Sequence, residues 1–384
     1  MPERKGTILY VGGFELPDKN AAAHRVLNNG KIFRELGYKV VFLGISHEAT
    51  QLTAGLVQGF DMWSIPYPKT RKEWNTYLTS IDVVKEVAGS LPDLKFMVFY
   101  NYQSVCLWKA MKYCKKRKIK TIVDVTEWYM APKSNPIFYA IKQSDTSVRM
   151  RYLNKKADGI IAISSYLKEY YEKSGCRNVI QLPPLVDIKE PKWHQSTKKK
   201  DDNKIHIVYA GSTNKDKDKL NVVIHSLADA EVNVEFSIVG ISSEDYLSNY
   251  LEDKELIDLL VKKCVVRFLG RLPHVESLRL LQEADYSVFY REATLLNMAG
   301  FPTKFVESIT CGTPVITTNT SDLSIYIKNG ELGGYLLSNN NFIEELRDAL
   351  HNNTMIYVDC SIFDYKKYID EIADLINKSS YNKV

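Results

Sequence analysis

The 384-residue sequence has no long hydrophobic run. No stretch reaches the roughly 18 consecutive apolar residues that a membrane-spanning helix needs. Near the N-terminus, the apolar run over residues 8–11 ends at Gly12-Gly13, so it is too short for the core of a secretory signal. Because both features are missing, we expect a protein of the cytoplasm.

Cysteine patterns and cofactor motifs are also sparse. The six cysteines are scattered, with no C-x-x-C pair and no group of histidines and cysteines at zinc-ligand spacing. No D-x-D stands in a loop that suits a metal-bound diphosphate, and the dinucleotide fingerprint G-x-G-x-x-G is missing. We therefore expect a reducing compartment, no structural metal, no cofactor and no metal requirement.

The charge is nearly even. Lysine and arginine number 51 against 46 acidic residues, a formal charge of +5 that is too mild to indicate a nucleic-acid partner. A hydrophobic fraction of 45% is ordinary for a globular protein. The length favours two domains over one large core.

Apolar runs that suit buried strands alternate with helical segments along the chain. In the first half these runs cover residues 7–11, 39–43, 96–100, 121–125 and 159–163. The pattern starts again at residues 205–209 and continues at 234–239, 265–269, 286–290 and 314–316. Such alternation is typical of a doubly wound parallel sheet, so the sequence predicts two of them. Pro183-Pro184 and the charged stretch 198–203 bracket the boundary between the halves.

The most informative stretch covers residues 301–316. Pro302 suits the start of a helix, Gly312 suits its end, and residues 314–316 enter a buried strand. The free N–H groups at such a helix start hold phosphate in many α/β proteins, and Lys304 adds a full charge there. Glu307, one turn later, can accept hydrogen bonds from a ribose diol. A solvated helix is the alternative for either residue alone, but the combination favours a nucleotide site.

These residues carry a family resemblance. Phe-Pro-Thr-Lys-Phe-Val-Glu-Ser, followed by Cys-Gly-Thr-Pro-Val-Ile, resembles the donor-binding segment of GT-B glycosyltransferases, specifically the retaining group called family 4. The resemblance implies an α/β fold of two Rossmann-like domains whose parallel sheets face a central cleft. Residues 1–186 would bind the acceptor and residues 203–361 the nucleotide-sugar donor. A C-terminal helix within 362–384 would cross back onto the first domain.

The resemblance also assigns roles on the donor side. Glu307 would bind the nucleotide ribose, whereas Ala299 stands where the family has a first glutamate. The further donor-binding residues are Gly12, Gly13, Gly211, Ser212, Lys217, Lys219, Arg271, Pro302, Thr303 and Phe305. A tight turn at Gly12-Gly13 and a solvated lysine turn at 215–219 remain the structural alternatives.

Catalysis would depend on groups that stabilise the departing diphosphate. Arg291, at the carboxyl edge of a predicted strand, is the best candidate for a bidentate phosphate clamp, with a structural ion pair as the alternative. Lys304 would assist it.

Candidate residues also lie in the first half. Asp124 and Glu127, as candidate catalytic residues, and Trp128 lie where the predicted strand 121–125 ends, and there they can either grip a sugar or build the loop and core. His24 and Arg25 would lie near the cleft on the acceptor side.

The sequence thus predicts a glycosyltransferase that moves a sugar from a UDP- or GDP-sugar to a hydroxyl of a glycan or lipid-linked glycan, with retention. A nucleotide-sugar 2-epimerase of the same fold and a non-catalytic partner protein are the alternatives. Basic clusters at 115–118 and 149–156 suggest attachment to the inner face of a membrane, against the alternative of a solvated surface.

Overall fold

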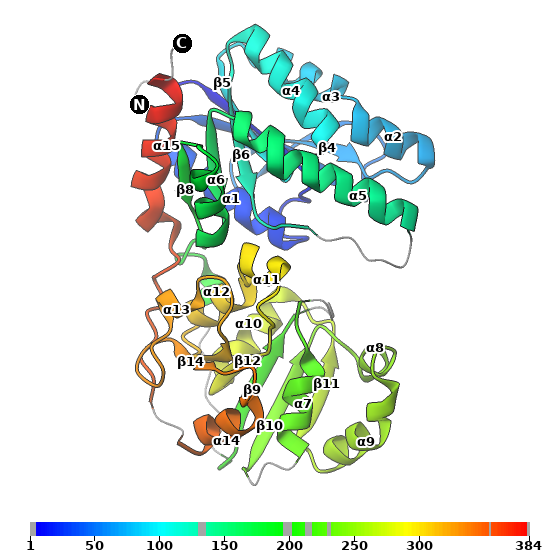
Figure 1. Ribbon diagram of the computed structural model, residues 1–384, viewed down its shortest axis with the longest axis vertical. Coiled ribbons are helices and arrows are strands. Elements are labelled where there is room, and N and C mark those ends of the chain that lie inside the picture. Colours follow the sequence, from blue (N-terminus) through cyan, green and yellow to red (C-terminus); the bar gives the residue numbers. More distant parts are fainter. Residues whose placement is uncertain are drawn as a thin grey trace. The chain divides into compact units, whose positions relative to one another are not determined.

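The structure is a computed structural model that describes residues 5–129, 136–194, 202–211, 217–228, 232–352 and 355–381. The chain divides into two compact units (Figure 1). The first comprises residues 1–187, 299–301 and 364–384, and the second comprises residues 188–298 and 302–363.

The first unit is built on an eight-stranded sheet with the order β3-β4-β2-β1-β5-β6-β7-β8. All neighbours are parallel except β3 and β4, which form an antiparallel pair at one edge. The strands are β1 Thr7–Gly12, β2 Lys39–Ser46, β3 Thr53–Val57, β4 Phe60–Pro66, β5 Leu94–Tyr100, β6 Lys120–Val125, β7 Gly159–Ala162 and β8 Val179–Gln181.

Helices cover both faces of this sheet. They are α1 Ala21–Glu35, α2 Arg71–Thr79, α3 Asp82–Gly89, α4 Ser104–Arg117, α5 Pro136–Val148, η1 Arg149–Leu153, η2 Asn154–Lys156 and α6 Ser165–Lys173. Successive strand residues point to opposite faces. Tyr10 of β1 therefore packs on Phe33 of α1. On β5, Val98 lies beside Tyr10, and the preceding residue, Met97, points to the opposite face and packs on Cys114 of α4. The continuous apolar strands follow from this two-sided burial.

The C-terminal segment returns to the first unit, as the sequence predicts. After η5 (Tyr365–Tyr368), helix α15 (Ile369–Tyr381) packs beside β7 and β8 (Figure 1). Asn178 donates to the carbonyl of Leu375 and to the hydroxyl of Ser379. A Cβ at Gly159 would lie 2.9 Å from the Leu375 side chain, so the close approach of α15 to β7 requires glycine there.

The second unit has a six-stranded, all-parallel sheet with the order β11-β10-β9-β12-β13-β14. Its strands are β9 Ile205–Ala210, β10 Val234–Val239, β11 Val266–Gly270, β12 Tyr286–Phe289, β13 Val315–Thr318 and β14 Gly334–Leu337. Its helices are η3 Pro191–Trp193, α7 Leu220–Ala228, α8 Ser243–Leu247, η4 Leu251–Asp253, α9 Lys254–Lys262, α10 His274–Glu283, α11 Leu295–Ala299, α12 Thr303–Thr310, α13 Leu323–Tyr326 and α14 Phe342–Asn352.

The two parallel sheets confirm the predicted pair of Rossmann-like domains. In the described residues, no helix is long and apolar enough to span a membrane. The predicted helix around residue 305 is also confirmed. Pro302 is the N-cap of α12, and Gly312 follows its C-cap with a φ of +80°, which a glycine adopts without strain.

Candidate functional site

The carboxyl edge of the second sheet gathers a buried group of charges. Asp218 follows β9 and the loop after it, Arg291 follows β12, and Lys304 lies in the first turn of α12. Arg291 Nε donates to Asp218 Oδ1 over 2.6 Å, and Lys304 Nζ donates to Asp218 Oδ2 over 2.5 Å. Each side chain is at most 10% exposed. We call Asp218, Arg291 and Lys304 the Asp218 cluster.

The Asp218 cluster carries more positive than negative charge. Two cations share one carboxylate, which also accepts a bond of 3.1 Å from the hydroxyl of Tyr209. Arg291 bonds to Asp218 through Nε alone, and its two terminal nitrogens bond to no residue that the structure describes. One formal positive charge is left over beside a fork of unused N–H donors. This arrangement suits a ligand that brings negative charge.

Burial and mutual repulsion shift the titration of this cluster. Burial lowers the pKa of Lys304 to about 8, because desolvation disfavours the ammonium; Asp218 opposes this shift and Arg291 adds to it. Burial by itself raises the pKa of Asp218, but Lys304 and Arg291 outweigh it and hold this pKa below its usual value. Asp218 is therefore ionised, and the pKa of Lys304 lies below that of an exposed lysine.

Two glycines let the neighbouring loops approach this cluster. A Cβ at Gly211 would lie 3.0 Å from Lys304 Nζ. Gly240 has a φ of +98°, and a Cβ there would come within 2.3 Å of the Gly211 carbonyl. Gly211, predicted from sequence to lie at the donor site, is thus in contact with the Asp218 cluster.

Glu307 lies on the next turn of α12 and meets a histidine. Its carboxylate is 3.2 Å from Nε2 of His274, the first residue of α10, and both side chains are partly exposed. His274 escaped the sequence analysis because a single histidine at a helix start carries no motif. The pair places a carboxylate and an imidazole near the start of α12.

The other predicted donor-binding residues differ in their contacts and in their exposure to solvent. Lys219 forms an ion pair with Glu292, and Asn297 donates to the carbonyls of Lys217 and Glu292. Arg271 and Thr303 are exposed. Ser212 lies outside the described residues.

The predicted donor-binding role of Phe305 requires a correction. Its side chain is fully buried and packs on Phe363 and Tyr326, so it belongs to the core of the second unit and does not face a ligand. The reason is helical geometry. Phe305 and Lys304 are neighbours in sequence and therefore point to different sides of α12. Pro302 is buried as the N-cap.

In the first unit, the predicted role of Asp124 in gripping a sugar is also corrected. Arg25 donates to both its oxygens at 2.7–3.0 Å, and Tyr10 donates to Oδ2 over 2.5 Å, with Asn29 as a further donor. Asp124 and Arg25 are almost completely buried. The pair, with Tyr10 and Asn29, forms an interior network that we call the Asp124 cluster. Neither Asp124 nor Arg25 is thus available to contact a sugar.

Arg25 also fixes the chain that follows β8 within the first unit. Its Nη1 donates to the carbonyls of Leu182 and Pro183, and Asn28 donates to the carbonyl of Leu185. These bonds hold the segment after β8 against α1. The predicted acceptor-side role of Arg25 is replaced by a structural one.

The remaining first-unit candidates divide similarly. Trp128 is 8% exposed and packs edge-on against Tyr170, which is the core alternative left open by the sequence. Gly12 is packed, since a Cβ there would lie 2.7 Å from Tyr100, whereas a Cβ at Gly13 meets only the Tyr77 hydroxyl at 3.5 Å. His24 and Glu127 are partly exposed.

A group of polar and aromatic side chains at the carboxyl edge of the first sheet was missed from the sequence. His47 Nδ1, after β2, lies 2.7 Å from Oε2 of Glu15, after β1, and Glu15 also accepts a bond from the His47 backbone N–H. The His47 ring stacks on Tyr67 with centroids 4.0 Å apart, and Tyr67 meets Trp74 edge-on. Glu15, His47 and Tyr67 follow three separate strands, and the strand order β4-β2-β1 brings them together.

The fold places the chain in the GT-B class of architecture, and solved structures of that class resemble it. A glycosyltransferase from Rickettsia africae is 15% identical over 99% of this chain and 100% of its own, with a TM-score of 0.65. HepE from Anabaena, solved in complex with UDP and glucose, is 15% identical over 97% and 99%, with a TM-score of 0.64. Sucrose-phosphate synthase from Thermosynechococcus elongatus is 13% identical over 98% and 94%, with a TM-score of 0.62.

The sequence of the second unit resembles a known family. Residues 189–361 match the family model described as glycosyl transferases group 1. This part of the chain is similar to that family, and the match indicates a glycosyltransferase. None of the curated protein sequences matches the chain.

Proposed function

We propose that this enzyme transfers a sugar from a UDP- or GDP-sugar to a hydroxyl of a glycan or lipid-linked glycan, with retention of the anomeric configuration. The observation that carries the proposal is the uncompensated positive charge of the Asp218 cluster, at the edge of a parallel sheet where ligands of such folds bind. A nucleoside diphosphate supplies the missing negative charge.

The chemistry demands stabilisation of a leaving group. When the bond between the anomeric carbon and the diphosphate oxygen breaks, the electron pair goes to the diphosphate and positive charge develops on the sugar. The terminal nitrogens of Arg291 and the ammonium of Lys304 would donate to the diphosphate oxygens as this charge grows. Because both cations are already oriented by Asp218, little reorganisation is needed. The chain's own cations supply the charge, so we propose no metal requirement.

Glu307 would bind the ribose of the donor. Its carboxylate accepts hydrogen bonds only, which suits a diol that donates two. His274, 3.2 Å away, would hold the carboxylate in one orientation. This role deepens the assignment that the family resemblance gives to Glu307 alone.

The acceptor would bind at the carboxyl edge of the first sheet, beside Glu15, His47, Tyr67 and Trp74. Aromatic rings stack on the apolar faces of sugars, and the imidazole and carboxylate hydrogen-bond their hydroxyls. A lipid-linked acceptor would place the enzyme at the cytoplasmic face of a membrane.

A screen of UDP- and GDP-sugars by thermal unfolding tests the proposal. A donor present at one hundred times its Kd stabilises the enzyme by about 2.7 kcal/mol. NMR analysis of the product with the best donor then gives the transferred sugar and its anomeric configuration. If no nucleotide stabilises the protein, the alternative of a non-catalytic partner protein is favoured instead. Conversion of the donor to an isomeric nucleotide sugar without acceptor would favour the epimerase.

A further inference from the structure

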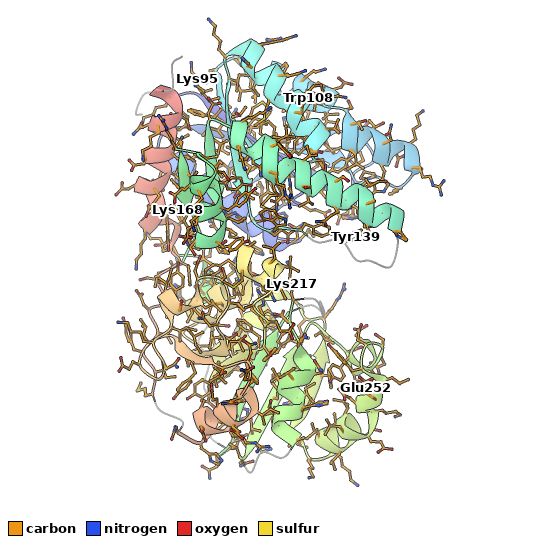
Figure 2. The ribbon with its side chains drawn as sticks, viewed as in Figure 1. Lys95, Trp108, Tyr139, Lys168, Lys217 and Glu252 are labelled. Atoms are coloured by element: carbon orange, nitrogen blue, oxygen red, sulfur yellow. The ribbon has the colours of Figure 1, made fainter. Side chains whose placement is uncertain are left out.

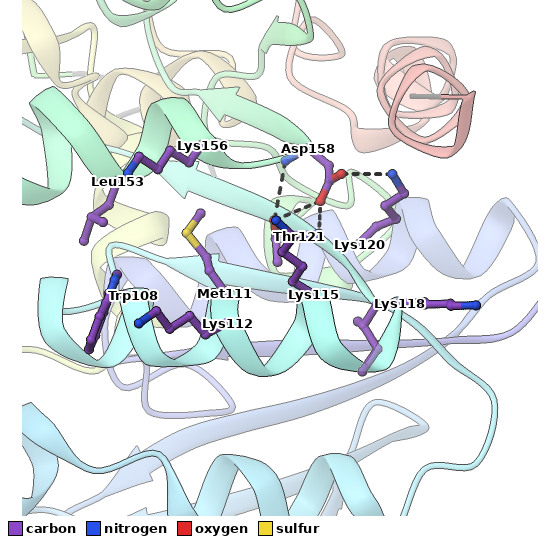
Figure 3. Close-up of a pocket in the computed structure, with 11 residues that line it drawn as sticks. Trp108, Met111, Lys112, Lys115, Lys118, Lys120, Thr121, Leu153, Lys156 and Asp158 are labelled. Atoms are coloured by element: carbon purple, nitrogen blue, oxygen red, sulfur yellow. Dashed lines mark hydrogen bonds and ion pairs between the residues drawn. The ribbon is translucent and has the colours of Figure 1, made fainter. Parts of the chain in front are cut away.

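The first unit contains a hollow that the proposed reaction does not use. It has a volume of about 600 Å³ and lies between α4, the start of β6 and the segment η1–η2 (Figure 3). Figure 3 shows Trp108, Lys112 and Lys115 along α4, with Leu153 and Lys156 across the hollow from them. The full lining is Trp108, Met111, Lys112, Lys115, Lys118, Ile119, Lys120, Thr121, Leu153, Lys156 and Asp158.

The lining has five lysines and one acid. The acid, Asp158, is already engaged: Oδ1 accepts from Lys120 over 3.0 Å, and Oδ2 accepts from the backbone and hydroxyl of Thr121. The four remaining lysines are Lys112, Lys115, Lys118 and Lys156, and none of them forms an ion pair with a described residue. The hollow therefore has four positive charges with no counter-charge in the part of the chain that the structure describes.

The walls between these ammonium groups are apolar. Met111, Ile119 and Leu153 line the hollow together with the lysine stems. Trp108 is 45% exposed, and the Lys112 ammonium lies 3.7 Å from the centre of its ring. Its side chain on α4 can be followed in Figure 2. Cationic donors above an apolar wall match an amphiphile with an anionic headgroup better than a free, fully hydrated anion.

The helices around the hollow also expose apolar side chains. Val105 lies one turn before Trp108 on α4 and is exposed. On the adjacent α5 and η1, Phe138, Ile141, Val148 and Tyr152 are 42–63% exposed. Adjacent helices that expose large apolar side chains and also carry lysines form a mixed surface typical of proteins that bind anionic bilayers.

The hollow lies far from the reaction. Lys118 and Lys120 flank the turn into the amino end of β6, and Asp158 immediately precedes β7. The proposed acceptor contacts lie at the carboxyl ends of the strands, roughly 20 Å away along a six-residue strand. A headgroup held here would anchor the enzyme without occupying the acceptor position.

We propose that the hollow binds the phosphate of an anionic lipid headgroup while the α4–α5 surface lies on the bilayer. The inference deepens the membrane attachment proposed above and does not depend on sugar transfer. It also corrects the predicted basic cluster at 149–156. Arg149 is buried, so only its later members face solvent, and Lys156 lies in the hollow.

Co-sedimentation with vesicles of phosphatidylglycerol and phosphatidylcholine tests the proposal. We expect the full chain to bind these vesicles, to ignore pure phosphatidylcholine, and to dissociate as salt is raised. Replacing Lys112, Lys115, Lys118 and Lys156 together by glutamine should weaken binding by at least about 100-fold, because each lysine near an anionic surface contributes substantially.

A matched control removes the same charge elsewhere. Lys95, Lys262, Lys263 and Lys328 are exposed and outside the hollow, and their replacement by glutamine should leave binding within a few-fold of the wild type. A second variant, Trp108→Ala with Ile141→Ser, should weaken binding while leaving every lysine in place. Equal losses in the two lysine variants would show that net charge alone drives binding and would overturn the proposal.

Two further results are informative. One distinguishes a lipid headgroup from a free phosphate, and the other distinguishes the lipid-binding proposal from the glycosyltransferase proposal. Displacement of the enzyme from vesicles by soluble glycerol phosphate at the lipid's own concentration would overturn the lipid assignment in favour of a free phosphate ligand. Turnover of a soluble acceptor should be unchanged in the hollow variants, so a failure of vesicle binding leaves the glycosyltransferase proposal intact. Failure of turnover in the wild type would leave the hollow's role untouched.

Discussion

The two units each bury a cluster of charges, and the two clusters differ in one respect. In the Asp124 cluster, one arginine meets one aspartate, and all three guanidinium nitrogens of Arg25 donate to Asp124 or to the Leu182 and Pro183 carbonyls. In the Asp218 cluster, two cations share one carboxylate, and the terminal nitrogens of Arg291 bond to no described residue. The first cluster pairs one cation with one anion and engages every guanidinium nitrogen of Arg25, whereas the second does neither for Arg291.

This difference distinguishes a structural role from a binding role. Burying a charge costs several kcal/mol unless partners compensate it. A saturated pair such as Arg25–Asp124 meets this requirement within the fold. A cluster with surplus charge is stable only at some cost, and a bound anion removes that cost. Sequence position does not separate the two cases, since Asp124 and Arg291 both lie at the end of a strand.

The largest expected effect comes from breaking the neutral cluster. Asp124→Ala leaves the Arg25 guanidinium buried without its carboxylate, which should destabilise the first unit by about 3–5 kcal/mol. Thermal unfolding monitored by circular dichroism measures the loss, and no nucleotide should restore it. A variant with an unchanged Tm would mean that the two clusters do not differ in role.

The converse change in the second cluster should affect activity and spare stability. Arg291→Ala leaves Lys304 and Asp218 as a neutral pair, so the Tm should stay near that of the wild type. Loss of one oriented donor to the leaving diphosphate should lower kcat/KM by roughly 100-fold or more, about 2.7–4 kcal/mol. Steady-state kinetics with the best donor sugar provides the measurement.

Arg291→Lys is the control for geometry. A lysine keeps the charge but lacks the planar fork, so it should recover little activity. Full activity in Arg291→Lys would exclude a bidentate contact and leave only a charge effect at this position.

The sequence predicts the fold well because strand and helix periodicity are local properties. The two parallel sheets and α12 were predicted in this way, whereas the return of α15 was predicted from the family resemblance. The clusters were not, because they depend on side-chain direction. Phe305 and Lys304 are adjacent, yet one enters the core and the other meets Asp218. Asp218 itself went unnoticed between two lysines, and a rule that every buried cation needs an acid would have drawn attention to it.

A contact outside both clusters should have a smaller effect. Glu307→Ala should weaken UDP or GDP binding by roughly 10- to 100-fold, the value of a hydrogen bond to a charged group, without changing the Tm. Calorimetry measures the affinity. His274→Ala, which removes only the orienting partner, should lose less than Glu307→Ala. Unchanged affinity together with a lower Tm in Glu307→Ala would assign Glu307 to the structure of α12 and α10.

A further effect concerns pH and separates the clusters without any mutation of the first unit. The pKa of Lys304 is about 8 in the folded protein, because burial and Arg291 disfavour its ammonium more than Asp218 supports it. In the unfolded chain a lysine retains its proton to about pH 10.4. Between these values the unfolded chain binds more protons, so this lysine adds stability as pH rises.

Nucleotide binding should change in the opposite direction over the same range. A diphosphate needs the protonated Lys304, so its affinity should be constant below about pH 8 and fall above it by up to roughly tenfold per pH unit. In the Asp124 cluster, burial and Asp124 raise the pKa of Tyr10, and Asp124 raises that of Arg25 against burial, so neither group titrates near neutral pH. As pH is raised from about pH 7 to about pH 10, calorimetry should therefore show weaker binding of a UDP- or GDP-sugar. Thermal unfolding over the same range should show the stability that Lys304 adds. Lys304→Met should remove both trends, and a wild-type affinity that does not vary with pH would contradict a role for this ammonium in holding the diphosphate.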